Sequence, residues 1–274
     1  MRAAEQQTIL VTGSTAGLGK ELASELAARG VTVLVHGRSD ASVDAALADI
    51  AAKTGSTRLV PRVADLSSLD AVRRLADEVA AAHGRIDALV NNAGAVLPER
   101  RESTDGYELT FAVNYLAPFL LTLKLLPVLR QSRPARVVNV ASAGQAPVNF
   151  DDVMLQRRYE MTFAYSQSKL ALISFTFELA ERLRDRGETE VTATALHPAT
   201  LMPTKLVLET LGRTIDGLEQ GVAATLRLVI DPQLYGVSGV YFDGLEEAAA
   251  DPQAYEKDAR VRLWELSERL CEVR

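Results

Sequence analysis

The chain has 274 residues, of which 47% are apolar and 24% are charged, a balance typical of a globular protein with a substantial core. Its formal net charge of −6 argues against a broad basic surface for nucleic acid. The single cysteine, Cys271, excludes an intrachain disulfide.

Short β-branched runs alternate with amphipathic segments along the chain. The predicted strands are residues 8–13, 31–37, 57–64, 86–94, 135–142, 190–196 and 239–243. The predicted helices are residues 17–29, 40–53, 67–82, 105–130, 160–186, 216–230 and 255–270. The strands are nearly continuous apolar runs, as in a parallel sheet covered on both faces. We therefore predict one α/β domain over residues 1–274, a doubly wound, Rossmann-type parallel sheet of about seven strands flanked by helices.

No apolar leader precedes the first strand. The most apolar helical segment, residues 115–129, is too short to cross a bilayer and carries Lys124. We therefore expect a cytoplasmic protein without a membrane anchor, in which this segment belongs to a core or to a subunit interface.

Ligands of such sheets bind beyond the carboxyl ends of the strands. The first strand is followed by TGSTAGLG, whose glycines open a helix with the spacing G-x-x-x-G-x-G. Glycines there allow a phosphate to approach backbone N–H groups at a positive helix end, although a tight strand–helix connection alone also favours glycine. The position after the first strand favours cofactor binding. The predicted cofactor ligands in this turn are Gly13, Ser14, Thr15, Gly17, Leu18 and Gly19.

The second strand is followed by HGRS, where an NAD-preferring site usually carries an acid for the ribose 2′-hydroxyl. The first acid is Asp40, whereas Arg38 can pair with a 2′-phosphate through its planar guanidinium. We therefore predict NADP(H) in preference to NAD(H), bound by Arg38 and Ser39. A solvated surface arginine is the alternative, and His36 is expected to pack or cap rather than to catalyse.

The next two strand ends also carry candidate cofactor ligands. Asp65 and Leu66 follow the third strand. A carboxylate at that position can accept a hydrogen bond from the adenine amino group or cap the next helix. Asn92, Ala93 and Gly94 belong to the NNAG motif after the fourth strand, which suits a backbone passing close to a ligand but also an ordinary turn.

Ser142 follows the fifth strand, and Tyr165 and Lys169 lie four residues apart near the start of a predicted helix. Residues i and i+4 share one helix face. A free tyrosine has a pKa of about 10, and a nearby ammonium group lowers it. The pair is therefore predicted to act as a general acid and base between an alcohol and a carbonyl, although the spacing alone also arises by chance.

Together, these motifs resemble the short-chain dehydrogenase/reductase family over essentially the whole chain. The resemblance also includes Asn114 in FAVNYLAPF. It implies that Tyr165 moves the hydroxyl proton, that Lys169 binds the nicotinamide ribose and lowers the tyrosine pKa, and that Ser142 holds the substrate oxygen. Asn114 is expected to hold a proton-relaying water, or else to satisfy a kinked backbone near Pro118.

A narrower resemblance is to the retinol-dehydrogenase-like branch, in which the interval between the serine and the tyrosine is long; here it is 23 positions. After the sixth strand, the family's usual Pro-Gly is replaced by Pro198-Ala199. Pro198 and Thr200 are predicted to pass near the nicotinamide. Residues 199–215 are predicted to form a flap over the substrate, with a packed helix as the alternative. Its apolar lining would come from Leu201, Met202, Leu206, Val207 and Leu208.

We predict a metal-independent, NADP(H)-dependent oxidoreductase of the ketoreductase type, acting on an apolar small molecule. The alternatives are a non-redox epimerase, dehydratase or cyclase, or a cofactor-sensing binding protein. Members of the family usually pair through the helices at 105–130 and 160–186, which predicts a homodimer or homotetramer unless the helix near 255–270 covers that surface. The apolar residues available for pairing are Leu116, Phe119, Leu120, Leu123, Leu125 and Leu126.

Overall fold

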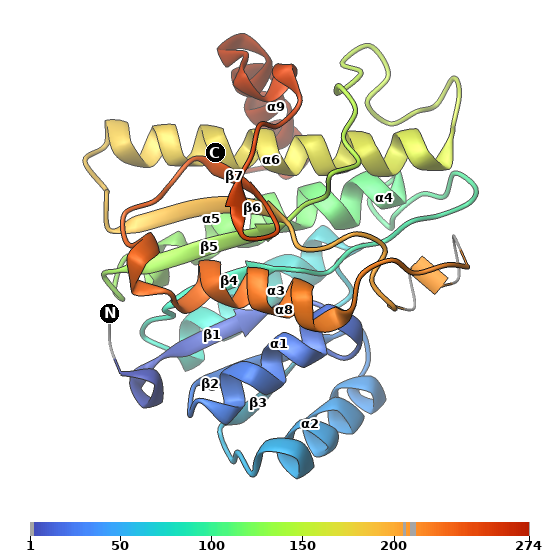
Figure 1. The fold of residues 1–274 in the computed structure, drawn as a ribbon. Helices are drawn as coiled ribbons and strands as arrows, with labels where there is room; N and C mark the ends of the chain where they lie inside the picture. Colours follow the sequence, from blue (N-terminus) through green and yellow to red (C-terminus); the bar gives the residue numbers. More distant parts are fainter. Residues whose placement is uncertain (1–2, 205–206, 209–211, 274) are drawn as a thin grey trace.

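The computed structural model describes residues 3–204, 207–208 and 212–273. Within them one sheet of eight strands runs in the order β3-β2-β1-β4-β5-β6-β7-β8, with only β8 antiparallel to its neighbour (Figure 1). The predicted doubly wound α/β fold is confirmed, with β8 as an eighth strand beyond the seven expected. The strands are β1 (Thr8–Val11), β2 (Thr32–Gly37), β3 (Leu59–Val63), β4 (Ala88–Asn91), β5 (Ala135–Val140), β6 (Val191–His197), β7 (Val240–Asp243) and β8 (Glu246–Glu247).

The helices lie close to the predicted ranges. Side chains cap several of them: Ser39 accepts a hydrogen bond from the N–H of Ser42 at the start of α2, and Glu160 accepts from Thr162 at the start of α6. The longer helices are α1 (Gly17–Ala28), α2 (Asp40–Thr54), α3 (Leu69–Ala82), α5 (Ala117–Leu129), α6 (Met161–Asp185), α8 (Leu218–Ile230) and α9 (Lys257–Leu270). The short turns are η1 (Ala4–Gln6), α4 (Leu109–Phe111), the π-helix η2 (Ala112–Leu116), η3 (Pro232–Leu234) and η4 (Pro252–Tyr255).

Helices cover both faces of the sheet. Successive strand residues point to opposite faces, so Ile9 and Val11 pack in the cluster with α1, α2 and α8, whereas Leu10 packs in the cluster with α3, α5, α6 and α9. In Figure 1, α1 and α8 lie side by side in front of the sheet. This double cover explains why the strands are nearly continuous apolar runs.

The strand order reverses between β1 and β4. β1 pairs with β2 on one side and with β4 on the other, so the helices that follow these strands leave in opposite directions. The carboxyl ends of β1 and β4 therefore border the crevice in which sheets of this kind bind ligands.

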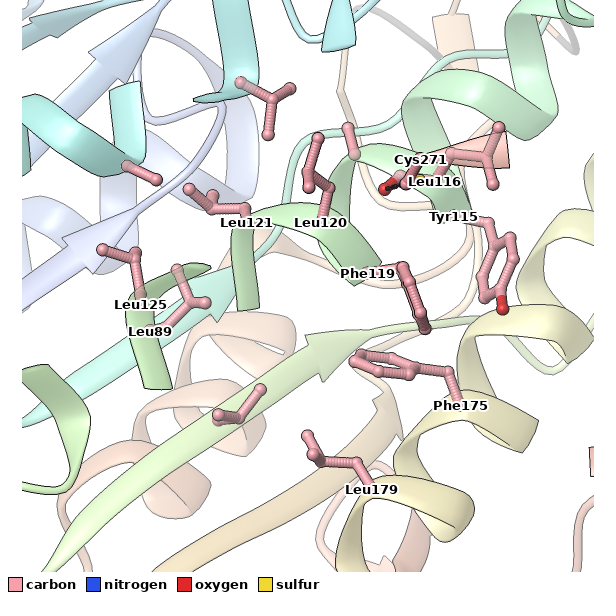
Figure 2. Packing of buried hydrophobic residues seen from close by; sticks show 14 of the residues in the cluster. Leu89, Tyr115, Leu116, Phe119, Leu120, Leu121, Leu125, Phe175, Leu179 and Cys271 are labelled. Atoms are coloured by element: carbon pink, nitrogen blue, oxygen red, sulfur yellow. Dashed lines mark hydrogen bonds between the residues drawn. The ribbon is translucent and has the colours of Figure 1, made fainter. Parts of the chain in front are cut away.

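The apolar surface predicted for subunit pairing lies in the core of the chain itself. Phe119 of α5 and Phe175 of α6 face each other, with ring centroids 5.3 Å apart (Figure 2). Trp264 of α9 packs on both, at 5.1 Å from Phe119 and 5.9 Å from Phe175. The predicted alternative, in which the last helix covers this surface, is what the structure contains. The pairing candidates in this core are Leu116, Phe119, Leu120, Leu125 and Leu126, with Leu123 partly buried against it.

The helical run Leu109–Leu129 has the length and composition of a membrane span. This corrects the expectation that the segment is too short to cross a bilayer, because the run begins earlier than residue 115. In the structure, 72% of its most apolar window is buried inside the protein. The run packs against α3 and α6.

Candidate active site

The glycine turn after β1 requires glycine at two positions for different reasons. Gly13 has a φ of 64°, and a Cβ there would lie 2.8 Å from the Cα of Ala93. A Cβ on Gly19 would lie 2.4 Å from the side-chain nitrogen of Asn92 and equally close to the carbonyl oxygen of Gly13. The end of β4 is therefore pressed onto the turn, and a side chain at either position would separate them.

A set of hydrogen bonds joins the turn to the end of β4. Thr12 Oγ1 accepts from the backbone N–H groups of Asn92 (3.0 Å) and Ala93 (3.1 Å). Asn92 Nδ2 donates in return to the carbonyl oxygens of Thr12 (2.8 Å) and Gly13 (3.1 Å). These hydrogen bonds fix the backbone after β1 and the backbone after β4 relative to each other, at the border of the crevice. Thr12 was not among the predicted site residues, although a hydroxyl residue at the end of the first strand is a signal in the sequence.

Not every residue predicted in the turn can present its side chain to a ligand. Ser14 is fully buried, and its hydroxyl donates to the carbonyl of Val11 (2.8 Å) and accepts from the N–H of His36 (2.8 Å). Leu18 and, after β3, Leu66 are buried in the two core clusters. These three residues can offer a cofactor only their backbone groups.

The ends of β2 and β3 hold the remaining predicted cofactor ligands. Arg38 is exposed and makes no ion pair with another described residue. A Cβ on Gly37 would lie 2.4 Å from Thr15 Cγ2, so this glycine lets Thr15 lie against β2. Ser39 caps α2, and Asp65 is exposed, with Oδ1 accepting from the N–H of Ser67 (2.9 Å). A glycine-rich turn at the start of a helix, an exposed guanidinium and an exposed carboxylate fit a dinucleotide.

Tyr165, Lys169 and Ser142 meet where α6 passes the end of β5. The Ser142 hydroxyl lies close enough to Tyr165 to lower the pKa of the tyrosine hydroxyl through hydrogen bonding. Lys169 is only 4% exposed; its Nζ donates to the carbonyl of Val140 (2.8 Å) and lies 5.6 Å from the centroid of the Tyr165 ring. The i, i+4 relation predicted from the sequence therefore places both side chains on one face, beside the fifth strand.

Burial dominates the protonation of this pair. It raises the pKa of the Tyr165 hydroxyl, against which the hydrogen bond to Ser142 acts. It lowers the pKa of the Lys169 ammonium to about 8. The role of Lys169 in lowering the tyrosine pKa stays a prediction, since burial and Ser142 are the two influences on the Tyr165 pKa in this structure.

Asn114 lies in the π-helix η2 and bonds to the segment after β4. Its Oδ1 accepts from the N–H of Ala95 (2.7 Å), and its Nδ2 donates to the Ala95 carbonyl (3.0 Å) and to Ser168 Oγ (2.9 Å). A Cβ on Gly94 would lie 3.5 Å from Asn114 Oδ1 and 3.7 Å from Lys169 Nζ. Asn114 and Lys169 thus meet at Gly94. Ser168, which links Asn114 to α6, was missed because nothing in the sequence pairs these segments.

The loop after β5 is held from two sides. The carbonyl of Ser142 accepts from Tyr241 Oη of β7 (3.1 Å) and from Gln145 Nε2 (3.1 Å). The hydroxyl of Ser142 accepts from the N–H of Gly144 (3.0 Å). These bonds hold both the backbone carbonyl and the hydroxyl of Ser142 in place. Neither Tyr241 nor Gln145 was identified from the sequence.

The segment predicted as a flap begins over the glycine turn. Pro198 is buried, and Thr200 is held by Asp216, whose Oδ2 accepts from its N–H (2.6 Å), and by His197 Nε2, which lies 3.1 Å from its hydroxyl. A Cβ on Gly17 would lie 3.1 Å from Thr204 Cγ2. Residues 205–206 and 209–211, including the predicted lining residue Leu206, lie outside the described residues.

The short-chain dehydrogenase family model matches residues 7–211. The chain belongs to this family. It is 36% identical to human retinol dehydrogenase 13 over 96% of this chain and 84% of that protein. It is 35% identical to mouse retinol dehydrogenase 12, over 97% of this chain and 86% of that protein. The predicted resemblance to the retinol-dehydrogenase-like branch is confirmed.

Solved structures share the fold of this chain. A crystal structure of a protein from Mycobacterium paratuberculosis has a TM-score of 0.80 and 32% identity, covering 97% of this chain and 94% of that chain. The Pseudomonas aeruginosa RhlG/NADP active-site complex has a TM-score of 0.67 and 28% identity, covering 89% of this chain and 97% of that chain. The family uses NAD(P), which agrees with the fit of the glycine turn to a dinucleotide.

The predicted cytoplasmic location is wrong. Retinol dehydrogenases 12, 13 and 14, to which this chain is similar over nearly its whole length, are membrane-associated. The helical run Leu109–Leu129 is also long enough and apolar enough to cross a membrane. The prediction rested on the missing leader and on the supposed shortness of the apolar segment, and neither feature excludes association with a membrane.

Proposed function

We propose that this short-chain dehydrogenase interconverts an alcohol and a carbonyl on an apolar small molecule, with NADP(H) as cofactor and Tyr165 as acid and base. The observation that carries the proposal is the meeting of Tyr165 with Ser142 on one side and Lys169 on the other, next to Gly94 and the glycine turn. A phenol, a hydroxyl and an ammonium group around one point suit proton transfer to or from a substrate oxygen.

The cofactor site is proposed to follow the ends of β1 to β4. The backbone N–H groups that open α1 would bind the pyrophosphate, since nothing projects from Gly13, Gly17 and Gly19. Asp65 would accept from the adenine amino group. The segment Pro198–Thr200 and the backbone from Asn92 to Gly94 would border the nicotinamide. When bound, a nicotinamide dinucleotide supplies or accepts the hydride.

The proton is proposed to move along groups of the chain itself. Ser142 would hold the substrate oxygen, since the N–H of Gly144 holds its hydroxyl and Tyr241 holds its carbonyl. In carbonyl reduction, Tyr165 would donate its hydroxyl proton to that oxygen. Lys169, still charged near neutral pH, would stabilise the phenolate that remains. Asn114, adjacent to Lys169 at Gly94, would hold the water through which the proton is replaced.

An apolar substrate is supported by the relatives and by the flap. The matched relatives are named for retinol, an apolar alcohol. On this chain, Met202 is buried at the base of the predicted flap and Leu208 is half exposed. The homodimer or homotetramer stays a prediction; it would need a surface other than the α5–α6 face, or a displaced α9.

The first experiment follows oxidation of NADPH and of NADH against a panel of apolar aldehydes and ketones that includes retinal. We expect turnover by the unaltered protein and its loss in Tyr165→Phe, because the phenyl ring has no proton to give. The affinity for NADPH, measured by fluorescence titration, should stay nearly unchanged in the variant. Full activity of Tyr165→Phe would overturn the mechanism, and substrate conversion without change in nicotinamide absorbance would favour the non-redox alternative.

The preference for NADP(H) has its own test in Arg38→Ala. Removing the guanidinium should weaken NADPH binding about tenfold, the effect of one charge-assisted hydrogen bond, and leave NADH binding unchanged. Arg58→Ala, at an exposed arginine just before β3 and thus at the opposite end of the parallel strands from Arg38, is the control and should leave both affinities unchanged. Equal NADPH and NADH affinities in the unaltered protein would contradict the role of Arg38.

A further inference from the structure

His36 is a buried side chain whose ring lies against the glycine turn. It is 1% exposed, near the carboxyl end of β2. Its Nδ1 accepts a hydrogen bond from the backbone N–H of Gly13 (3.0 Å), and its Nε2 lies 3.2 Å from the carbonyl oxygen of Ala64, after β3. Its own N–H donates to Ser14 Oγ (2.8 Å), and its carbonyl accepts from the N–H of Ser14 (2.9 Å). One residue thus connects the ends of three strands.

The two ring contacts fix the protonation of the imidazole. A backbone N–H can only donate, so Nδ1 must carry no proton, and a carbonyl can only accept, so Nε2 must carry one. A charged ring would set two N–H groups against each other at Gly13. Burial also lowers the pKa of His36 to about 4, against weaker effects of the Ala64 carbonyl and of the Asp65 carboxylate, which favour the charged form. The ring is therefore neutral near neutral pH.

Gly13 depends on such outside contacts. With a φ of 64° and no side chain, its peptide groups are held by hydrogen bonds from neighbouring strand ends. Its carbonyl accepts from Asn92 Nδ2 on the β4 side, and its N–H donates to His36 Nδ1 on the β2 side. The N–H groups that follow it into α1 point according to how Gly13 is held, and these are the groups available to a phosphate.

We propose that His36 is a positioning residue of the dinucleotide site: by accepting the Gly13 N–H at Nδ1, its neutral ring sets the geometry of the glycine turn and hence the affinity for the cofactor pyrophosphate. The proposal rests on the proposed cofactor site and adds to it a residue that makes no contact with the cofactor. The proposal attributes the effect on cofactor affinity to Nδ1 alone. Variants that keep only the contact of Nδ1 or only the contact of Nε2 therefore test it.

The test compares His36→Asn with His36→Gln. The side-chain oxygen of asparagine occupies the place of Nδ1 and keeps an acceptor for Gly13, while the longer glutamine amide reaches the place of Nε2 and keeps only the bond to Ala64. We expect His36→Asn to bind NADPH within a few-fold of the unaltered protein. His36→Gln should bind about tenfold more weakly, because a buried N–H is left without a partner.

Two readouts separate positioning from general damage. The KM for NADPH should rise more than kcat falls in His36→Gln, and amide hydrogen exchange across residues 12–19 should speed up in that variant but not in His36→Asn. Equal affinities and equal exchange in His36→Gln and the unaltered protein would overturn the proposal. Equal losses in both variants would also overturn it, by showing that ring volume and not the acceptor matters.

A measurement on the unaltered protein covers the case in which the variants do not fold. Nitrogen NMR of the His36 ring should show a bare Nδ1 and a protonated Nε2 at pH 7; the opposite tautomer or a charged ring would contradict the proposal. If the unaltered protein binds neither NADPH nor NADH, the proposed function fails, while the ring NMR and the exchange at Gly13 still report on the His36 contact.

Discussion

At the scale of single residues, the candidate site contains two ionisable side chains, Tyr165 and Lys169, whose pKa values are shifted by burial. Lys169 is 4% exposed, and its ammonium group donates a hydrogen bond to the carbonyl of Val140. Its pKa of about 8 leaves it charged at neutral pH, at a cost in stability, because the unfolded lysine binds its proton more tightly. A buried charge that destabilises the folded state is typical of a residue with a role in binding or catalysis rather than in folding.

This cost gives a prediction about Lys169→Met. The folded pKa of about 8 lies below the unfolded value of about 10.4, so the charged lysine opposes folding at pH 7 and this opposition fades as the pH rises from 8 to 10.4. The variant should lose turnover but unfold in urea at pH 7 with a free energy higher by about 1–2 kcal/mol, after the lost bond to Val140 is allowed for.

The control is Lys53→Met, at an exposed lysine paired with Glu21, which should change stability by less than about 1 kcal/mol. Between pH 8 and 10 the unaltered protein should gain stability relative to Lys169→Met. A Lys169→Met protein that is several kcal/mol less stable at pH 7 would mean that the lysine is structural.

At the scale of elements, α9 is fixed to the rest of the protein by both aromatic and ionic contacts. Trp264 packs on both Phe119 and Phe175, with the guanidinium of Arg182 4.2 Å from its ring centroid. Arg260 binds Glu178 and Glu181 of α6, at 3.4 and 2.6 Å. These contacts hold α9 over the face that α5 and α6 would otherwise expose, and explain why the leucines predicted for pairing are buried.

Trp264→Ala should therefore weaken the packing of α9 on α5 and α6. We expect the free energy of unfolding to fall by about 3–5 kcal/mol, the usual effect of removing a buried tryptophan. If the helix detaches, the exposed apolar face should cause concentration-dependent self-association, measured by light scattering after size-exclusion chromatography. Glu265→Ala, on the exposed side of α9, is the control and should change neither quantity. An unchanged stability in Trp264→Ala would show that α9 is not the cover we describe.

Local sequence patterns predicted the elements because each depends on neighbours in the chain. The strand and helix ranges were right to within a few residues, except that the helix predicted from residue 105 begins at Leu109 and contains a π-helical turn at Ala112–Leu116. That turn places Asn114 toward Ala95 and Ser168, and periodicity carries no signal for one additional residue in a turn.

At the scale of the whole molecule, one sheet brings the candidate groups together. The turn after β1, the loops after β2 to β6 and the start of α6 lie at one edge because parallel strands end on the same side. The predicted assembly through α5 and α6, and the predicted location, were inferred from apolar composition. Composition does not say whether an apolar helix is covered by its own chain, by a second copy or by lipid.

The sequence by itself determined the alternation of strands and helices, the glycine turn and the four-residue spacing of Tyr165 and Lys169, because these are local and follow from backbone geometry. Only the tertiary structure decided that His36 holds Gly13, that Asn92 and Thr12 lock two strand ends, and that α9 covers α5 and α6. Those contacts join segments far apart in the chain, so they depend on strand order and register, which a local pattern does not specify.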